Sequence, residues 1–228
     1  MASTPPVPPG NRGNLEDLDM RVARETVVVL AAILATVLAA CQATGPLAPK
    51  DPADVGLRPG DLPSTLRRCP GSGDLGDHLR ATGAEGGPAR DELQAAWRTL
   101  QREGAQQAAV AVYASDRASC TARLGTGPGP NASSLVVRYR DDGAALGAYR
   151  QGMLGFPTPG QDEQVPGLQQ GTATGLGQDS WLLEQNAAGR SVFVAYWRRG
   201  SYTAFFLAVD LDPLHARQAV GSIAARMP

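Results

Sequence analysis

The sequence has few of the residues that enzymes use for catalysis. It contains two histidines and three cysteines, and it has no Gly-x-Ser-x-Gly nucleophile elbow, no P-loop and no dinucleotide-binding glycine motif. His78 and His215 fit no zinc-binding spacing. We interpret both histidines as solvent-exposed, and we expect no catalytic residue, no metal and no cofactor.

The sequence also lacks an excess of charge of either sign. Its 21 Lys and Arg residues face 22 Asp and Glu residues, which gives a formal net charge of −1, and Lys50 is the only lysine. A domain that binds nucleic acid normally carries a basic patch or stripe. The balance of charge therefore argues against nucleic acid as a partner.

No apolar run is long enough for an ordinary membrane-spanning helix, which needs about 20 residues. The longest run, residues 26–40, has the length of a signal-peptide core, about 7–15 residues. Arg21 and Arg24 precede this run, and two alanines at its end lead into Cys41. The pattern predicts a cleaved signal peptide, and an uncleaved membrane anchor is the alternative.

The last four residues of this region, Leu38-Ala39-Ala40-Cys41, resemble the lipobox of bacterial lipoproteins. The resemblance implies that Cys41 receives a diacylglycerol and becomes the first residue of the mature protein. Acyl chains would then hold the protein on the extracytoplasmic face of the cell membrane. The membrane is therefore an expected partner, reached through the lipid anchor.

We divide the chain into four parts. Residues 1–19 are an acidic, proline-rich extension that translation from Met20 would leave out. Residues 20–40 are the lipoprotein signal peptide, residues 41–61 a flexible tether rich in Pro, Gly and Asp, and residues 62–228 one extracytoplasmic domain. A genuine cytoplasmic tail is the alternative for the extension, and it would favour the uncleaved anchor.

Cysteine is scarce, and the number of cysteines is informative. If Cys41 carries lipid, Cys69 and Cys120 remain as an even pair in an oxidising compartment. We therefore expect a disulfide bond between them. Two buried free thiols are the alternative.

Hydrophobic periodicity predicts both helices and strands. The period of residues 90–103 indicates an amphipathic helix, and Asp141 and Asp212 are placed to cap two more. Strands are predicted at residues 108–114, 119–124, 134–140, 172–177, 180–185, 191–198 and 201–209. Residues 62–79 and 155–167 have the composition of irregular segments. This order of elements predicts an α+β fold with a mostly antiparallel sheet packed with helices.

Aromatic residues make up 5% of the chain, and several gather in the C-terminal strands. At strand spacing they are typical of a core. The alternative is a groove for a small apolar ligand, lined by Trp181 and Trp197 and covered by Phe156 in its proline-rich loop. These three residues are the candidate ligand-binding residues.

The C-terminal part, residues 135–227, resembles secreted sensor-like domains of high-GC bacterial lipoproteins and of receptor-kinase ectodomains. The shared features are a strand-helix unit, a Gly-Asp-Trp-like step, a hairpin and a closing helix. The step reads Gly177-Gln178-Asp179-Ser180-Trp181 here, so Gln178 and Ser180 interrupt it. The resemblance implies a fold similar to the PsbP/Mog1 type, an antiparallel sheet between helices, and no functional residue is carried over.

These features lead to one hypothesis and two alternatives. The hypothesis is a lipid-anchored cell-envelope protein whose domain binds a partner or senses a signal without catalysis. Its ligand would be an unknown protein or a small apolar molecule. The first alternative is an extracytoplasmic carrier of a small apolar or lipid ligand, and the second is an envelope enzyme.

Overall fold

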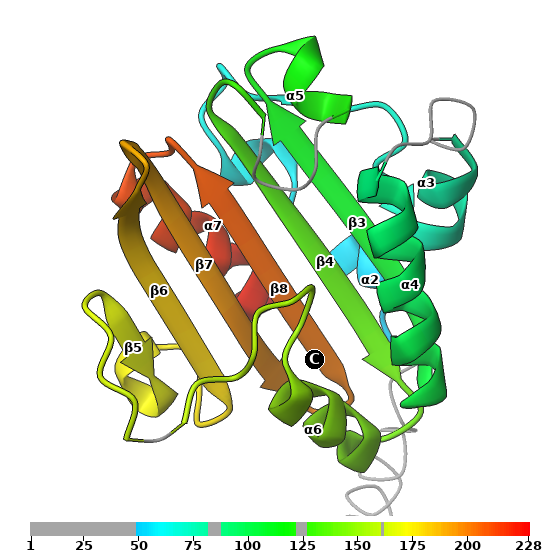
Figure 1. Ribbon diagram of the computed structural model, residues 1–228. Helices are drawn as coiled ribbons and strands as arrows, with labels where there is room; N and C mark the ends of the chain where they lie inside the picture. The colour runs from blue at the N-terminus through cyan, green and yellow to red at the C-terminus, as the bar shows by residue number, and fades with distance from the viewer. Residues whose placement is uncertain (1–48, 82–87, 122–126, 161) are drawn as a thin grey trace, which may run out of the picture. The chain divides into compact units, whose positions relative to one another are not determined.

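The computed structural model describes residues 49–81, 88–121, 127–160 and 162–228 (Figure 1). Residues Pro49–Pro228 form one compact unit. At its centre lies one eight-stranded sheet, in which every strand pairing is antiparallel. Helices pack against this sheet, so the predicted α+β fold is confirmed.

The strands follow the order β1-β3-β4-β8-β7-β6-β5, and β2 pairs with another part of β3. The strands are β1 Arg67–Arg68, β2 Gly73–Asp74, β3 Ala105–Ala114, β4 Asn131–Tyr139, β5 Leu168–Gln170, β6 Ser180–Ala187, β7 Arg190–Arg199 and β8 Tyr202–Val209. The helices are α2 Pro52–Val55, η1 Pro59–Asp61, α3 Leu75–Ala81, α4 Pro88–Arg102, α5 Arg117–Thr121, α6 Asp142–Gln151, η2 Gly171–Thr174 and α7 Pro213–Arg226.

Helices cover both faces of the sheet (Figure 1). On the face that we call the α7 face, α7 and the α2 segment bury a core that includes Val55, Phe193, Trp197, Phe206 and Ile223. On the opposite, α6 face, residues of α3, α4 and α6 bury a core that includes Leu79, Leu100, Tyr149, Tyr196 and Phe205. A strand covered on both faces is apolar at consecutive positions. This explains why β7 and β8 are apolar almost throughout.

The antiparallel strands give the sheet two distinct ends. β3 begins, β4 ends and β7 turns into β8 at one of them. Lys50 lies at this end, where its carbonyl oxygen accepts a hydrogen bond from the hydroxyl of Tyr202, the first residue of β8, at 2.7 Å. We call this end of the sheet the Lys50 end. The opposite end carries α5 and the turn between β6 and β7 (Figure 1). We call it the disulfide end.

The tether predicted for residues 41–61 is wrong in its second half. Asp51 caps α2, and a proline occupies the first position of the helix. Val55 and Leu57, which follow, are buried against the α7 face. The folded unit therefore begins at Pro49, and the earlier part of the predicted tether lies outside the described residues.

Three further local predictions are wrong. The described part of residues 119–124 belongs to helix α5 instead of a strand, because Asp116 caps this helix. Residues 172–177 begin with the η2 turn. Residues 62–79, expected to be irregular, contain β1, β2 and much of α3. Specific hydrogen bonds outweigh the apolar pattern: those of Asp116 and Thr174 are local, and that of Cys69 to Val112 is long-range.

The remaining helices and strands are confirmed to within a few residues. Asp141 caps α6 by accepting from the Ala144 N–H at 2.7 Å. Gly200 adopts a φ of 54° between β7 and β8, in a region that favours glycine. The hairpin thus closes where the sequence placed an Arg-Gly step.

Candidate functional site

The aromatic residues predicted to line one groove do not lie together. Trp181 pairs in register with Tyr196 on the α6 face. Trp197 follows Tyr196 in β7 and therefore points to the α7 face, where its Nε1 lies 2.9 Å from the sulfur of Met227. Both tryptophans are buried. The prediction of a single groove is wrong for Trp197.

Phe156 packs directly on the α6 face. The centre of its ring lies 6.5 Å from that of Trp181 and 5.4 Å from that of Phe205. A backbone bridge to Met153 holds the loop in place. Gly152 has a φ of 92°, and a side chain there would collide with the Phe156 carbonyl oxygen. The ring is half-buried and completes the core at this point.

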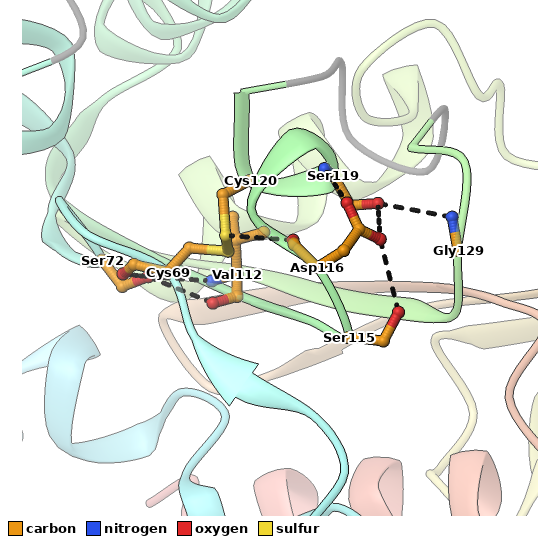
Figure 2. Close-up of a disulfide and its surroundings, with 8 residues drawn as sticks. All are labelled: Cys69, Ser72, Val112, Ser115, Asp116, Ser119, Cys120 and Gly129. Atoms are coloured by element: carbon orange, nitrogen blue, oxygen red, sulfur yellow. Dashed lines mark hydrogen bonds between the residues drawn. A yellow bond between two sulfur atoms is a disulfide. The ribbon is translucent and has the colours of Figure 1, made fainter.

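The predicted disulfide bond between Cys69 and Cys120 is present (Figure 2), with 5.4 Å between the Cα atoms. Cys69 is buried beside β3, where its N–H donates to the Val112 carbonyl oxygen at 2.8 Å. The Ser72 hydroxyl accepts from the Val112 N–H at 3.1 Å. The bond therefore attaches α5 to the segment that pairs with β3. Cys41, the predicted lipidation site, lies outside the described residues.

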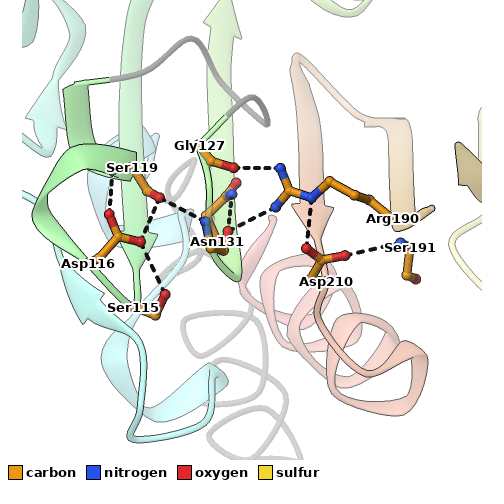
Figure 3. A network of polar contacts seen from close by, with 9 residues as sticks. Ser115, Asp116, Ser119, Gly127, Asn131, Arg190, Ser191 and Asp210 are labelled. Carbon is orange, nitrogen blue, oxygen red and sulfur yellow. Dashed lines mark hydrogen bonds and ion pairs between the residues drawn. The ribbon is translucent and has the colours of Figure 1, made fainter. Parts of the chain in front are cut away.

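Asp116 organises the turn between β3 and α5 (Figure 3). One carboxylate oxygen accepts from the Ser119 N–H at 2.9 Å, and the other accepts from the Ser119 hydroxyl at 2.9 Å and the Ser115 hydroxyl at 3.4 Å. These hydrogen bonds, led by that from the Ser119 N–H, lower the pKa of Asp116. Asp116 is thus an ionised helix cap.

Arg190, the first residue of β7, connects this region to the end of β8 (Figure 3). Its Nη1 and Nη2 donate to the carbonyl oxygens of Gly127 and Gly129 at 2.6 and 3.1 Å, and its Nε donates to Asp210 Oδ2 at 2.7 Å. Asp210 also accepts from the Ser191 N–H at 3.1 Å. The planar fork of the guanidinium suits this set of acceptors. We call this contact the Arg190 clamp.

A second arginine makes a similar contact near the end of α7. Arg226 donates from Nε to the Val55 carbonyl oxygen at 3.0 Å and from Nη2 to the Gly56 carbonyl oxygen at 2.8 Å. Its Nη1 and Nη2 also bind the two carboxylate oxygens of Asp61 at 3.0 and 2.6 Å. We call this contact the Arg226 clamp. It fastens the α2 segment to α7.

The two histidines lie on opposite faces of the sheet, because α3 packs on the α6 face and α7 on the other. His78 is half-buried, so the prediction that it is solvent-exposed is wrong. Its Nδ1 lies 3.1 Å from the Gly71 carbonyl oxygen. Burial lowers the pKa of His78, and this hydrogen bond partly offsets the effect. His215 is exposed beside Asp212, the cap of α7.

Three buried hydroxyl groups lie on the α6 face, those of Tyr139, Tyr196 and Thr203. None of them makes a hydrogen bond of good geometry within the part of the chain that the structure describes. Burial raises the pKa of both phenols, and the Thr203 hydroxyl offsets only part of this rise. Tyr149, stacked on Tyr196 at 5.2 Å, has its pKa raised to about 12, mainly by burial. These phenols stay neutral at physiological pH and are poor bases.

The described ranges contain neither a candidate metal centre nor a candidate membrane-spanning helix. No group of three His, Cys, Asp or Glu side chains within them could hold a metal ion. No helix in these ranges is long and apolar enough to cross a membrane. The polar residues described above instead bind backbone groups and helix ends.

Comparison with protein-family models, curated proteins and solved structures found no match to this chain. Membership of a lipoprotein or PsbP/Mog1-like family therefore stays a prediction. The two arginine clamps were not predicted from the sequence. Their partners lie 61 to 63 residues away for the glycines that bind Arg190 and 165 residues away for Asp61. No local pattern marks contacts of this kind.

Proposed function

We propose that this chain is a bacterial lipoprotein whose folded unit binds a partner or senses a signal on the extracytoplasmic face of the cell membrane. The pairing of the cysteines carries this proposal. Cys69 and Cys120 bind each other, which leaves Cys41, directly after the apolar run, as the cysteine available for lipid. Disulfides persist in oxidising compartments, the destination that a lipobox implies.

We further propose that the folded unit acts by binding and not by catalysis. Asp116, Arg190 and Asp210 already hold segments of the fold together, and His78 is engaged with a backbone carbonyl. A general base has to accept a proton from a substrate. Arg190 is already protonated at neutral pH. Protonation of Asp116 or Asp210 would weaken hydrogen bonds that stabilise the fold, so these three groups are poor candidates for that role.

The lipid anchor is tested by the Cys41→Ser variant. Wild-type protein in a bacterial host should incorporate a labelled fatty acid and sediment with membranes, because two or more acyl chains anchor a protein stably. The variant should lose the label and accumulate as the longer precursor. The neighbouring Gln42→Ala variant is the matched control and should keep the label. An unlabelled wild-type protein, or a variant labelled as strongly as wild type, would contradict the proposal.

A carrier function has one observation in its favour. The Phe156 ring covers Trp181, whose buried Nε1 has no hydrogen-bond partner within the described residues. A movement of the loop would uncover an apolar site with one free donor. Native mass spectrometry of the folded unit purified from a bacterial host tests this idea. A bound lipid that disappears in a Phe156→Ala variant would favour the carrier over the partner-binding domain.

A further inference from the structure

We propose that the Lys50 end of the folded unit faces the lipid bilayer and that the disulfide end faces away from it. The proposal rests on the lipid anchor at Cys41 proposed above. It adds an orientation, and with it a surface that contacts phospholipid headgroups. The orientation follows from the length of the connection to the anchor and from the place where the folded unit begins.

The folded unit begins at the Lys50 end of the sheet. The Lys50 carbonyl oxygen accepts from the Tyr202 hydroxyl at 2.7 Å, and the Lys50 amine donates to the Arg226 carbonyl oxygen at 2.8 Å. Asp51 accepts from the Gln107 side chain, near the start of β3, at 2.8 Å. The first described residues are therefore fastened to three different elements at this end. Their position does not depend on the segment that precedes them.

The connection from the anchor to this end is short. Only residues 42–48 separate Cys41 from Pro49. A fully extended chain covers about 3.3–3.6 Å per residue, so the two residues are at most about 29 Å apart. The headgroup layer is about 5–8 Å thick on each side of a bilayer, and it takes up part of this distance. Less than about 25 Å then remains above the headgroups.

The folded unit is longer than this reach. β3 contains 10 residues and runs from the Lys50 end to the disulfide end. At about 3.4 Å per step, the nine steps of the strand span about 31 Å. If the disulfide end touched the bilayer with the strand upright, the Lys50 end would stand about 31 Å above it, farther than the connection extends. The unit can tilt, but it cannot invert.

The positive charges at the Lys50 end are paired within the protein, so the short connection, and not attraction to acidic lipids, sets the orientation. Arg140 pairs with Asp141 at 3.2 Å. Lys50 and Arg199 both donate to backbone carbonyl oxygens in the last turn of α7. These cations are engaged within the protein, so strong attraction to acidic lipids is not expected. Leu214 is 63% exposed and lies at the start of α7, which follows the end of β8 at the disulfide end. In this orientation Leu214 is therefore held away from the membrane.

The orientation can be measured on the full lipidated protein in vesicles that contain a headgroup-attached quencher. A dye is placed through an unnatural amino acid at Gln106, near the Lys50 end, or at Asn186, near the disulfide end. Both positions are exposed. We expect a large loss of fluorescence at position 106 and little loss at position 186, with or without acidic lipid.

The outcomes separate the orientation from the anchor. Flotation with the vesicles but equal quenching at both positions, or stronger quenching at 186, would overturn the orientation alone. A difference that appears only with acidic lipid would overturn the argument from length. Failure to float would overturn the anchor and the orientation with it.

A variant with a longer connection is the matched control for the argument from length. An insertion of about 30 Gly and Ser residues after residue 45 has a root-mean-square length of about 30 Å and can extend much farther. The unit could then turn over. We expect the difference in quenching between positions 106 and 186 to shrink in this variant. An undiminished difference would contradict the length argument, since some other contact would then hold the unit in place.

Discussion

The Arg190 and Arg226 clamps use the same chemistry at different places in the fold. Each guanidinium binds two backbone carbonyl oxygens and one carboxylate. The segment held by Arg190 follows a helix that is also attached by the Cys69–Cys120 disulfide. The segment held by Arg226 has no covalent attachment of this kind within the described residues, and it relies on buried side chains such as Val55. The fold therefore places a covalent bond beside the Arg190 clamp and buried apolar side chains beside the Arg226 clamp.

Removal of the disulfide tests the covalent side of this comparison and should have the largest effect. The bond spans 51 residues. Loss of the chain-entropy constraint on the unfolded state costs at most about 4 kcal/mol. We expect reduction to lower the free energy of unfolding by an amount approaching this value, measured by urea denaturation of the Cys41→Ser protein. An unchanged midpoint would show that the bond is not a stabilising element.

The effect of reduction should also be local. With the Arg190 clamp left as the remaining attachment, α5 should become sensitive to protease before the rest of the sheet. Residues 49–62 should stay protected, because the Arg226 clamp does not involve either cysteine. Cleavage that begins in residues 49–62 would contradict this division.

Loss of the Arg226 clamp should have the next largest effect. Arg226→Met leaves the Asp61 carboxylate without its ion-pair partner, and the Asp61 side chain is only 9% exposed. Removal of one partner from a buried pair costs about 3 kcal/mol. Arg217→Met, which breaks an ion pair to Glu184 that is 34–40% exposed, is the matched control and should cost less than about 1 kcal/mol. Equal costs in urea denaturation would argue against the clamp.

Loss of the Arg190 clamp should cost less, because the disulfide still attaches the neighbouring helix. Arg190→Met removes three hydrogen bonds from a side chain that is 28% exposed, and we expect a cost of about 1–2 kcal/mol. The cost should rise when the disulfide is reduced, and a double-mutant cycle measures this coupling. Arg199→Met, which removes one hydrogen bond to the end of α7, is the control. Additive effects of reduction and Arg190→Met would show that the two attachments act independently.

The smallest expected effect concerns pH. Burial lowers the pKa of His78 below its value in the unfolded chain. Because the unfolded chain then binds more protons, stability should fall as the pH drops below about 6.5 and should level off below the folded-state pKa. His78→Gln should flatten this part of the profile of unfolding free energy against pH. An unchanged profile in the His78→Gln variant would contradict this assignment.

The sequence predicted the parts of the fold that local patterns determine. Alternating apolar residues located the long strands, and Asp141 and Asp212 located the starts of two helices. The count of cysteines predicted the disulfide. The prediction of a tether up to residue 61 was wrong because Val55 and Leu57 stand among prolines and glycines, where two apolar residues show no period.

The candidate site was harder to predict than the fold. Trp181 and Trp197 are both aromatic strand residues, and only the register between β6 and β7 places them on opposite faces. In the sequence, nothing distinguishes Arg190 from any other arginine that follows a glycine. Its partners become visible only when β7, β8 and the start of β4 lie side by side. Neither the register nor these contacts can be read from a local window of sequence.

If Cys41 carries the proposed lipid anchor, the position of Lys50 gives a way to release the folded unit from a membrane. A lysine-specific endoproteinase has a single site in this chain, between Lys50 and Asp51. In the folded state this site is held by the Tyr202 hydroxyl and by the end of α7. Cleavage therefore has to wait for the first residues of the unit to detach. The rate at which intact cells release the unit would report how often that happens.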